Sequence, residues 1–341
     1  MARVVVTGGA GYIGSHTCVA LLGAGHEVLV VDDLRRSHAR ILDGIAAITG
    51  RPPAVERIDV ADPRALTAAL VRWGPVDAVV HLAAYKSVRE SVAHPTRYYG
   101  NNIGATVAVL DAMSAVGCGR MVFSSSCTVY GQPDRLPVTE DTPLAPPQSP
   151  YGATKQMCER LLADASAAGM LSSSVSLRYF NPAGAHPSAL IGELPLGVPD
   201  NLVPFITQTA AGWRSRLEIF GSDYPTPDGT AVRDYLHVVD LADAHLAALD
   251  AVLAGPVDLR AYNLGAGRGV SVREVVDAFE QATGVPVPVT MSPRRPGDVT
   301  EVWASPQRAV AELGWTARRP LAEIVASAWA WQLTLGPQPP A

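Results

Sequence analysis

The feature that most constrains the fold is a glycine-rich turn between a predicted strand and a predicted helix. The strand Arg3–Thr7 is followed by Gly8, Gly11 and Gly14, and an amphipathic helix is predicted over Ser15–Leu22. The first glycine permits a tight turn, the second lets the backbone approach a pyrophosphate, and the third lets helix and strand pack closely. Free N–H groups at the start of the helix favour an anion. The spacing departs slightly from the commonest fingerprint, but its place between strand and helix predicts a dinucleotide-binding turn.

An acidic residue after the second predicted strand indicates which dinucleotide would bind. The strand is Val28–Val31, and Asp32 follows it, 18 positions after Gly14. A carboxylate there accepts hydrogen bonds from the adenosine ribose and repels a 2′-phosphate, which favours NAD over NADP. Arg35 and Arg36 lie just beyond Asp32 and leave NADP as an alternative.

Strand and helix patterns alternate through the first half of the chain. Short apolar runs predict further strands at Ala54–Ile58, Ala78–His81, Met121–Ser124 and Val175–Tyr179. Ala- and Leu-rich stretches between them, such as Arg64–Trp73 and Thr106–Val116, predict helices. Buried strands separated by helices indicate βαβ units and a parallel sheet covered on both faces. We therefore expect an α/β fold, with a Rossmann-like doubly wound parallel sheet and a second, smaller α/β domain.

The composition of the chain changes near residue 181. Residues 181–204 and 221–235 are rich in Pro, Gly, Asn and Asp, which is typical of loops that shape a binding site. Helices are then predicted at Val238–Leu253, Val272–Thr283 and Pro320–Leu333, and strands at Ala261–Leu264 and Val285–Thr290. We expect residues 1–180 to form a NAD-binding domain that also receives elements from about 234–260. Residues 181–341 would form the smaller substrate-binding domain.

Composition excludes several classes of function. A net charge of -5 does not provide the basic face that nucleic-acid binding requires, and no apolar run is long enough to cross a bilayer. The first residues lead straight into a strand, so we do not read them as a secretion signal. The cysteines show no metal-type or redox-type spacing; they are Cys18, Cys118, Cys127 and Cys158. We expect a cytoplasmic protein with reduced thiols, no resident metal, and no membrane or nucleic-acid partner.

Tyr151 and Lys155 form a candidate catalytic pair. Their i, i+4 spacing on a predicted helix places the two side chains on one face. A tyrosine with an ordinary pKa of about 10 is a poor base at neutral pH, but a nearby ammonium and a positive nicotinamide ring would stabilise its phenolate. The phenolate can then take a proton from a substrate hydroxyl while hydride leaves the same carbon. Ser126 follows another predicted strand and can bridge the substrate hydroxyl and Tyr151.

The distribution of lysines is also unusual. Of 27 basic residues only Lys86 and Lys155 are lysines, and the others are arginines. A lysine ammonium is compact and shifts its pKa readily, which an arginine cannot do. Chance would also leave a few lysines in a long chain, so composition alone assigns neither residue a role.

These motifs resemble those of a known family. Thr7–Gly14, Ser124–Gly131 and Tyr151–Lys155 resemble the extended short-chain dehydrogenase/reductase superfamily. Four further segments are similar to the UDP-glucose 4-epimerase family within it, namely Ser149–Gly152, Arg178–Pro187, Arg233–Val238 and Tyr262–Gly265. The similarity runs from residue 2 to about residue 333.

The resemblance implies a specific reaction. The reaction would interconvert UDP-galactose and UDP-glucose. NAD would stay bound throughout and be regenerated in each turnover. The residue matching Tyr151 takes the proton of the sugar 4-hydroxyl while C4 gives hydride to the nicotinamide. The resulting 4-keto sugar then turns and takes the hydride back on its other face. The family also suggests a homodimer joined by helices, which here would involve Ala105–Ala115 and Lys155–Leu162.

The resemblance also places ligand contacts on positions of this chain. Cofactor contacts would fall on Gly8, Gly11, Tyr12, Ile13, Gly14, Asp32, Asp33, Leu34, Arg35, Arg36, Ser37, Asp59, Val60, Leu82, Ala83, Ala84, Tyr85, Lys86, Asn101, Ser126, Tyr151, Lys155 and Phe180. Contacts to the UDP-sugar would fall on Ser126, Tyr151, Asn181, Asn201, Leu202, Phe220, Arg233, Arg295, Asp298 and Val302. The two arginines suit a diphosphate, because a guanidinium makes paired charge-assisted bonds with phosphate oxygens.

Two positions depart from the family pattern. Cys127 replaces the alanine of some members, which exchanges one small side chain for another. Val302 stands where relatives carry a bulky tyrosine near the C2 substituent of the sugar, and that tyrosine disfavours N-acetylated sugars. The smaller valine predicts that UDP-N-acetylglucosamine and UDP-N-acetylgalactosamine are also interconverted, unless another side chain fills the gap.

Other functions compete with this one. A sugar-nucleotide 4,6-dehydratase carries an acid pair just after the position of Ser126, whereas here Cys127 and Thr128 follow and the next carboxylate is Asp134. A decarboxylase or a UDP-sugar reductase matches the C-terminal motifs less well. A non-catalytic NAD sensor would be expected to lack Tyr151 or Lys155, and both are present.

Overall fold

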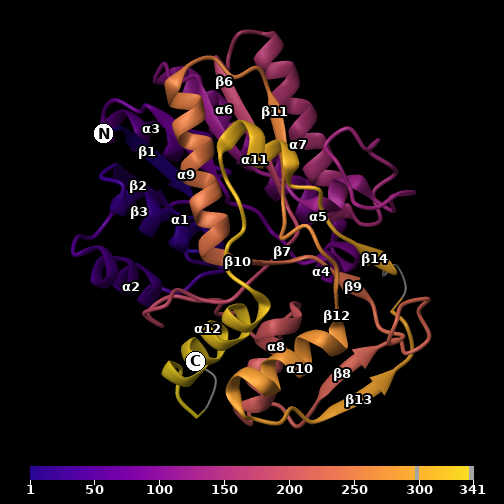
Figure 1. Cartoon of the computed structure of the whole chain (residues 1–341). Coiled ribbons are helices and arrows are strands. Elements are labelled where there is room, and N and C mark those ends of the chain that lie inside the picture. Colours follow the sequence, from indigo (N-terminus) through magenta and orange to yellow (C-terminus); the bar gives the residue numbers. More distant parts are fainter. Residues whose placement is uncertain (296–298, 338–341) are drawn as a thin grey trace.

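A seven-stranded sheet, in which every neighbouring pair is parallel, forms the larger part of the molecule (Figure 1). The computed structural model describes residues 1–295 and 299–337. In spatial order the strands are β11 (Arg260–Leu264), β6 (Ser173–Tyr179), β5 (Arg120–Ser124), β4 (Ala78–His81), β1 (Arg3–Thr7), β2 (Glu27–Val31) and β3 (Ala54–Glu56). The predicted doubly wound parallel sheet is confirmed, and its strand order reverses between β1 and β4.

Helices cover both faces of this sheet, as apolar strands of this kind require. One face packs against α1 (Tyr12–Gly23), α2 (Arg40–Thr49) and α9 (Val238–Ala254). The other packs against α3 (Pro63–Trp73), α6 (Gly104–Ala115) and α7 (Pro150–Ala167). Successive residues of β1 point to opposite faces of the sheet: Val4 and Val6 pack in the core of the first face, and Val5 packs in the core of the second. Both faces are therefore apolar and need a cover of helices.

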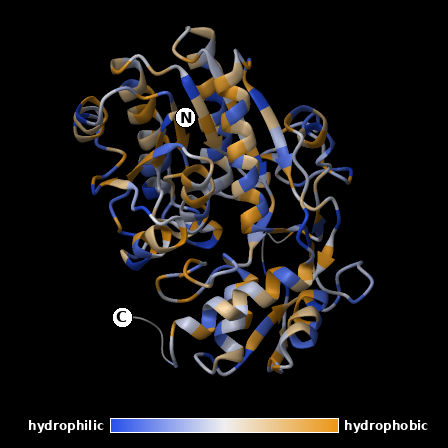
Figure 2. Ribbon diagram, turned by 60° about the vertical axis from the view of Figure 1, so that its left-hand side comes forward, coloured by the Kyte–Doolittle hydropathy of each residue, from blue (hydrophilic) through white to orange (hydrophobic). Residues whose placement is uncertain are grey.

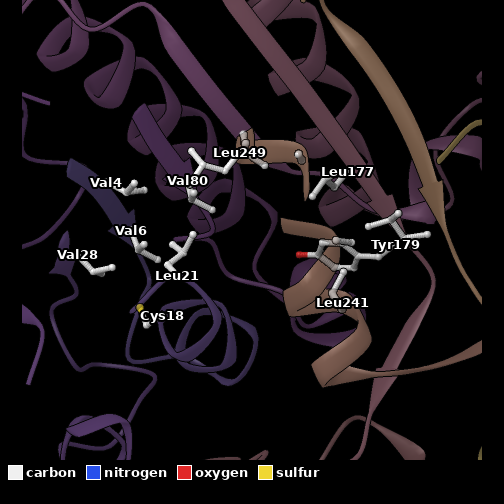
Figure 3. Packing of buried hydrophobic residues seen from close by; sticks show 14 of the residues in the cluster. Val4, Val6, Cys18, Leu21, Val28, Val80, Leu177, Tyr179, Leu241 and Leu249 are labelled. Atoms are coloured by element: carbon white, nitrogen blue, oxygen red, sulfur yellow. The ribbon is translucent and has the colours of Figure 1, made fainter. Parts of the chain in front are cut away.

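The first of these cores joins segments far apart in the sequence. Val4 and Val6 of β1 lie near Leu21 of α1 and Leu249 of α9 (Figure 3). All four side chains are fully buried, and burial of one such side chain contributes roughly 1.5–3 kcal/mol. The packing of α9 against α1 therefore fastens a late segment of the chain onto the early part of the sheet.

A smaller group of elements lies beyond one end of the sheet, at the bottom of Figure 1. Helices α8 (Leu202–Ala210), α10 (Val272–Thr283) and α12 (Leu321–Thr334) share a core with β8 (Leu217–Phe220). The largely exposed strand β13 (Val289–Ser292) pairs with β8 in parallel. The strand predicted at Val285–Thr290 corresponds to β13, which begins only at Val289. The reason is that the N–H groups of Val285 and Val287 are bonded to side chains of α10, namely Thr283 and Glu280.

The chain crosses between the two parts more than once. After β6 it forms β7 (Asn181–Ala183) and later β9 (Val232–Arg233) and β10 (Tyr235–His237). It then returns to the large sheet with α9 and β11 before forming β12 (Val270–Ser271), β14 (Glu301–Val302) and α11 (Gln307–Leu313). Strands β12, β9 and β14 form a small sheet, and β7 pairs with β10. Helix α11 packs on α9 and β11.

Short helical segments complete the described structure. They are α4 (Val88–Ala93), α5 (Pro95–Tyr98), the π-helical turn η1 (Tyr99–Ile103) and the 3₁₀ turn η2 (Cys127–Tyr130). Figure 2 shows hydrophobic residues distributed along the strands and helices of both parts. Among the helices of residues 1–295 and 299–337, none is both long and apolar enough to span a bilayer.

Candidate functional site

A large cavity opens at the carboxyl ends of the parallel strands, where the strand order reverses. Its volume is about 1260 Å³, which exceeds the roughly 300–1,000 Å³ of ordinary small-molecule pockets. Its wall combines the glycine turn, the ends of β2, β4 and β5, the segment after β6, and parts of α8 and β8. Open parallel sheets bind ligands at this switch point, and the size of this cavity allows two ligands.

The glycine turn brings the main chain so close together that no side chain fits, which leaves its backbone open to a ligand. Gly8 has a φ of +72°, and a Cβ added there would lie 2.8 Å from the nitrogen of Ala83. A Cβ on Gly14 would lie 2.1 Å from the carbonyl oxygen of Gly8, so only glycine allows α1 to pack this close. Helix α1 begins after Gly11 without a side-chain cap and without an acidic residue in its first turn. Its first N–H groups are therefore available to an anion in the cavity.

Asp32 presents an ordered carboxyl group to the same cavity. It accepts hydrogen bonds from the N–H of Ala10 at 3.1 Å, the N–H of Leu34 at 2.9 Å and the hydroxyl of Ser37 at 2.9 Å. Burial raises the pKa of Asp32, and the three hydrogen bonds oppose that rise. The carboxyl group is thus held in place before a ligand arrives.

The two arginines after Asp32 are engaged by carboxylates. Arg35 bonds to Asp33 at 2.6 Å and also to Asp59. Arg36 bonds to Glu90 at 2.6 Å. Each guanidinium therefore has an anionic partner within the protein, and a 2′-phosphate would have to displace that partner.

The helix that carries Tyr151 and Lys155 starts with a defined cap. The hydroxyl of Ser149 accepts a hydrogen bond from the N–H of Gly152 at 3.2 Å, and Pro150 occupies the first turn of α7. Both reactive side chains are buried, with Tyr151 8% and Lys155 4% exposed. The ammonium of Lys155 donates to the carbonyl oxygen of Ser124 at 2.5 Å and lies 5.9 Å from the centre of the Tyr151 ring.

Burial dominates the acid–base properties of this pair. It lowers the pKa of Lys155 to about 8. It raises the pKa of Tyr151 well above the ordinary value of a phenol, and nearby Tyr179 adds to the rise while a hydrogen bond with Ser126 opposes it. The sequence predicts that the Lys155 ammonium and a positive nicotinamide ring stabilise the Tyr151 phenolate together, and the protein alone supplies only the first of these two charges. Desolvation outweighs the ammonium, so the phenolate requires a further positive charge in the cavity.

Ser126 lies at the start of η2 and in the wall of the cavity. Its oxygen accepts from the N–H of Thr128 at 3.2 Å and from the hydroxyl of Thr128 at 3.0 Å. Because Ser126 is the acceptor in both bonds, its own hydroxyl proton can be donated to Tyr151 or to a ligand.

The other end of the cavity carries the residues predicted to bind the UDP-sugar. The guanidinium of Arg295 lies 3.6 Å from the centre of the Phe220 ring. The side-chain oxygen of Asn181 is buried and, among the described residues, has no hydrogen-bond partner. Asn201, Leu202 and Arg233 also line the cavity.

Most of the predicted cofactor positions lie in this single wall. Besides Ser126, Tyr151 and Lys155, it includes Gly8, Gly11, Tyr12, Ile13, Gly14, Asp32, Asp33, Arg36, Ser37, Asp59, Val60, Leu82, Ala83, Ala84, Tyr85, Lys86, Asn101 and Phe180. Three predicted residues of the described chain lie outside it. Leu34, which has a φ of 61°, does not line the cavity, and Arg35 pairs with Asp33 and Asp59 instead. Val302 packs behind the wall in a buried cluster with Phe180, and Asp298 lies outside the described residues.

Glu193 and Tyr179 are among the wall residues that were not predicted. Glu193, with its side chain 10% exposed, accepts from the ammonium of Lys86 and from the amide of Asn201, both at 2.7 Å. Nothing in a single sequence distinguishes this glutamate from other loop glutamates. Tyr179 is hydrogen-bonded to the hydroxyl of Ser124, and its place next to Phe180 in a recognised motif could have indicated it.

Histidines serve as buried neutral groups near the site. His81 is hydrogen-bonded to the hydroxyl of Thr7 at 2.7 Å and lies 3.3 Å from that of Thr106. Burial lowers its pKa to about 3, so it stays uncharged beside Lys155. Within residues 1–295 and 299–337, no three His, Cys, Asp or Glu side chains are grouped as metal ligands.

Comparisons with known proteins agree with this geometry. Residues 4–265 match the model of the NAD dependent epimerase/dehydratase family. The chain is 49% identical to a UDP-glucose 4-epimerase of Bacillus subtilis (strain 168), over 96% of both chains. A crystal structure of UDP-glucose-4-epimerase from Stenotrophomonas maltophila, with bound NAD and formylated UDP-arabinopyranose, is 47% identical with a TM-score of 0.95, over 98% of this chain and 99% of that one. A UDP-Glc/GlcNAc 4-epimerase from Campylobacter jejuni is 36% identical with a TM-score of 0.84, over 98% of this chain and 100% of that one.

Proposed function

This chain belongs to the NAD-dependent epimerase/dehydratase family, and from that premise we propose that it is a UDP-glucose 4-epimerase that interconverts UDP-galactose and UDP-glucose. The observation that carries the proposal is that all the groups the reaction needs line one cavity. Tyr151 and Lys155 share it with the glycine turn at one end and with Arg233 and Arg295 at the other. One cavity thus offers a dinucleotide site, a proton-transfer pair and a cationic site for a second diphosphate.

The residues at the glycine end fit NAD. The cradle formed by Gly8 and Gly14 has no room for a Cβ, and the free N–H groups of α1 suit a pyrophosphate. Asp32 is held where a ribose hydroxyl can donate to it. We assign this function to residues 1–180 together with α9 and β11, and UDP-sugar binding to the rest of the chain.

Tyr151 is the group that moves the proton of the sugar 4-hydroxyl. NAD, when bound, would supply the acceptor for the hydride of C4 and a positive charge that adds to that of Lys155 beside this tyrosine. Loss of the O–H proton to Tyr151 and of the C4 hydride leaves a 4-keto sugar. Return of the hydride to the opposite face of C4, and of the proton from Tyr151 to the C4 oxygen, would give the epimer. Ser126 orients the hydroxyl, and Lys155 holds positive charge next to the tyrosine.

The diphosphate of the UDP-sugar is assigned to the opposite end of the cavity. Arg233 and Arg295 provide guanidinium groups there. The side-chain oxygen of Asn181, which no described residue bonds, can accept a hydrogen bond from the ligand. In a 4,6-dehydratase the positions after Ser126 would carry an acid pair. Here they carry Cys127 and Thr128, both in the cavity wall, which favours epimerisation.

A direct assay tests the proposal. The protein is purified without added NAD, denatured to release any bound nucleotide, and in a parallel sample given UDP-galactose. We expect NAD in the released fraction and conversion to UDP-glucose without external cofactor. Net release of NADH into solution would instead indicate a dehydrogenase.

The variant Tyr151→Phe tests the role of the phenol. It should retain the fold and the bound NAD, because only a hydroxyl is removed from a buried ring. Turnover should fall about 10²–10⁴-fold, the usual contribution of a positioned acid–base group. Turnover close to that of the wild type would refute the mechanism.

N-acetylated substrates are a second candidate, supported by one observation. Val302 belongs to the same buried cluster as Phe180, which lines the cavity, and has less bulk than a tyrosine would. A relative from Campylobacter jejuni is described as a UDP-Glc/GlcNAc 4-epimerase. Assay of UDP-N-acetylglucosamine and UDP-N-acetylgalactosamine decides the question, and no turnover of this pair would remove the idea.

We also infer a cytoplasmic homodimer. Val107 on α6 and Met157 on α7 are 40% and 46% exposed on neighbouring helices, which gives a partner subunit an apolar surface. The four cysteines of the described chain are all unpaired, as a reducing compartment would leave them. Light scattering tests the dimer, and a mass of one chain would exclude it.

A further inference from the structure

A buried ion pair, Glu159 with Arg178, lies behind the reacting residues, and neither partner lines the cavity. The side chains of Glu159 and Arg178 are 10% and 9% exposed. One carboxylate oxygen of Glu159 accepts from Nη2 of Arg178 at 2.6 Å, and the other accepts from Nε at 2.9 Å. A two-pronged pair of this kind is strong and geometrically specific.

Glu159 also binds the segment that presents the functional groups. Its Oε1 accepts from the hydroxyl of Ser125 at 2.5 Å, and Ser125 is fully buried. The residue before Ser125 supplies the carbonyl that receives Lys155, and the residue after it is Ser126. The hydrogen bond to Glu159 thus fixes Ser125, which lies between the carbonyl that receives Lys155 and the hydroxyl of Ser126.

The far side of the ion pair is anchored in the rest of the sheet. Arg178 donates through Nη1 to the hydroxyl of Tyr130 at 2.9 Å. That hydroxyl donates to the side-chain oxygen of Asn263 on β11 at 2.7 Å. The network joins α7, the segment that follows β5, and β6, η2 and β11. Of the described residues that line the cavity, none is Ser125, Glu159 or Arg178.

We propose that Glu159 is a positioning residue for the Tyr151–Lys155 pair, acting through Ser125 and Arg178. This proposal rests on the proposed epimerase function. Glu159 lies one turn after Lys155 on the same face of α7. From there it ties that face to the Ser124–Ser126 segment, so that the acceptor of Lys155 and the hydroxyl of Ser126 keep their places relative to Tyr151.

The charge of Glu159 matters as well as its hydrogen bonds. The titratable or charged groups that surround Lys155 and Glu159 are Tyr151 and Cys158 on α7, His81 on β4, Tyr179 and Arg178 on β6, and Tyr130 on η2. His81 is neutral at pH 7, because burial lowers its pKa to about 3. Glu159 therefore balances the positive charge of Arg178 and favours the protonated form of Lys155.

Two variants separate positioning from general stability. Ser125→Ala removes the bond to the segment and keeps the ion pair. Glu159→Gln removes the charge and replaces one of the two oxygens that accept from Arg178 by an NH₂ group, which breaks the paired contact with the guanidinium. Ser176→Ala is the matched control, because Ser176 is equally buried on β6 and its hydroxyl has no partner among the described residues. The measurements are kcat and KM for UDP-galactose from pH 6 to 10, with the NAD bound per chain.

The expected result is a loss of kcat with little change of KM, because none of these side chains lines the cavity. We expect at least a tenfold loss for Ser125→Ala and about a hundredfold for Glu159→Gln, since small misplacements of reacting groups have effects of this size. Only Glu159→Gln should move the alkaline limb of the kcat profile to lower pH, because it removes the negative charge that favours the protonated form of Lys155. Ser176→Ala should match the wild type in all these measurements.

The outcomes distinguish the possible failures. Wild-type kcat in Ser125→Ala overturns the proposal, even where Glu159→Gln does not fold. The same loss of kcat in Ser176→Ala also overturns it, because any buried serine would then have the effect. A wild-type protein that binds NAD but does not epimerise UDP-galactose would instead refute the proposed function.

Discussion

Replacement of Gly14 by alanine tests whether the close approach of α1 to β1 creates the cofactor site. An alanine Cβ at this position would lie 2.1 Å from the carbonyl oxygen of Gly8 and 2.8 Å from the Cα of Gly9. All of these atoms belong to backbone, so no side chain can rotate away. An ordinary contact needs about 3.5 Å, and the helix must therefore move by roughly 1.4 Å.

This displacement should affect stability and binding together. Overpacking of a well-packed interior costs about 1–3 kcal/mol. The first N–H groups of α1 move with the helix, and so does the gap in which the pyrophosphate would lie. We expect the free energy of unfolding to fall by that amount and the bound NAD to be lost on purification.

A second glycine of the same helix provides the control. Gly23 is the last residue of α1, is exposed, and would meet no other atom within 4 Å of an added Cβ. Alanine there should be neutral or stabilise by about 0.5–1 kcal/mol. Chemical denaturation gives the free energy of unfolding, and denaturation in acid followed by chromatography gives the NAD per chain. A Gly14→Ala protein with a full complement of NAD and unchanged stability would refute the reasoning.

Three other predictions address separate parts of the molecule. Burial holds the pKa at about 3 for His16 and His81 and at about 4 for His237 and His245, so unfolding takes up protons below pH 6.5. The free energy of unfolding should fall as the pH is lowered from 6.5 to 4, by up to about 1.4 kcal/mol per histidine per pH unit, and equal stability at pH 7.5 and 5 would contradict this. Val302→Tyr should suppress turnover of N-acetylated sugars and spare UDP-galactose, whereas equal loss of both would show general damage to the core. Arg295→Ala should weaken binding of UDP, measured by calorimetry, at least tenfold without loss of NAD, whereas Arg294→Ala should not, because Arg294 pairs with Asp223.

Much of the architecture could be predicted from the sequence, because local chemistry specifies it. The glycine turn between strand and helix, and the apolar strands that follow, leave few alternatives to a doubly wound sheet. The spacing of Tyr151 and Lys155 likewise places the two side chains together on α7. These features depend on residues near one another in the chain.

Features that depend on distant residues could not be predicted. Glu193 meets Lys86 across 107 positions of sequence, and Ser125 meets Glu159 across 34. The raised pKa of Tyr151 reflects its burial by the whole fold rather than its spacing from Lys155. The later start of β13 likewise follows from hydrogen bonds between the N–H groups of Val285 and Val287 and side chains of α10.

The return of α9 and β11 to the large sheet also has a consequence for biosynthesis. A chain released after residue 180 would leave the edge of β6 unpaired and would expose the apolar surface that Leu241 and Leu249 cover in Figure 3. An unpaired strand edge beside exposed apolar side chains is prone to aggregation. The nascent sheet can therefore close only after about 264 residues have left the ribosome, and the cofactor-binding part should not be obtainable as a fragment that ends at residue 180.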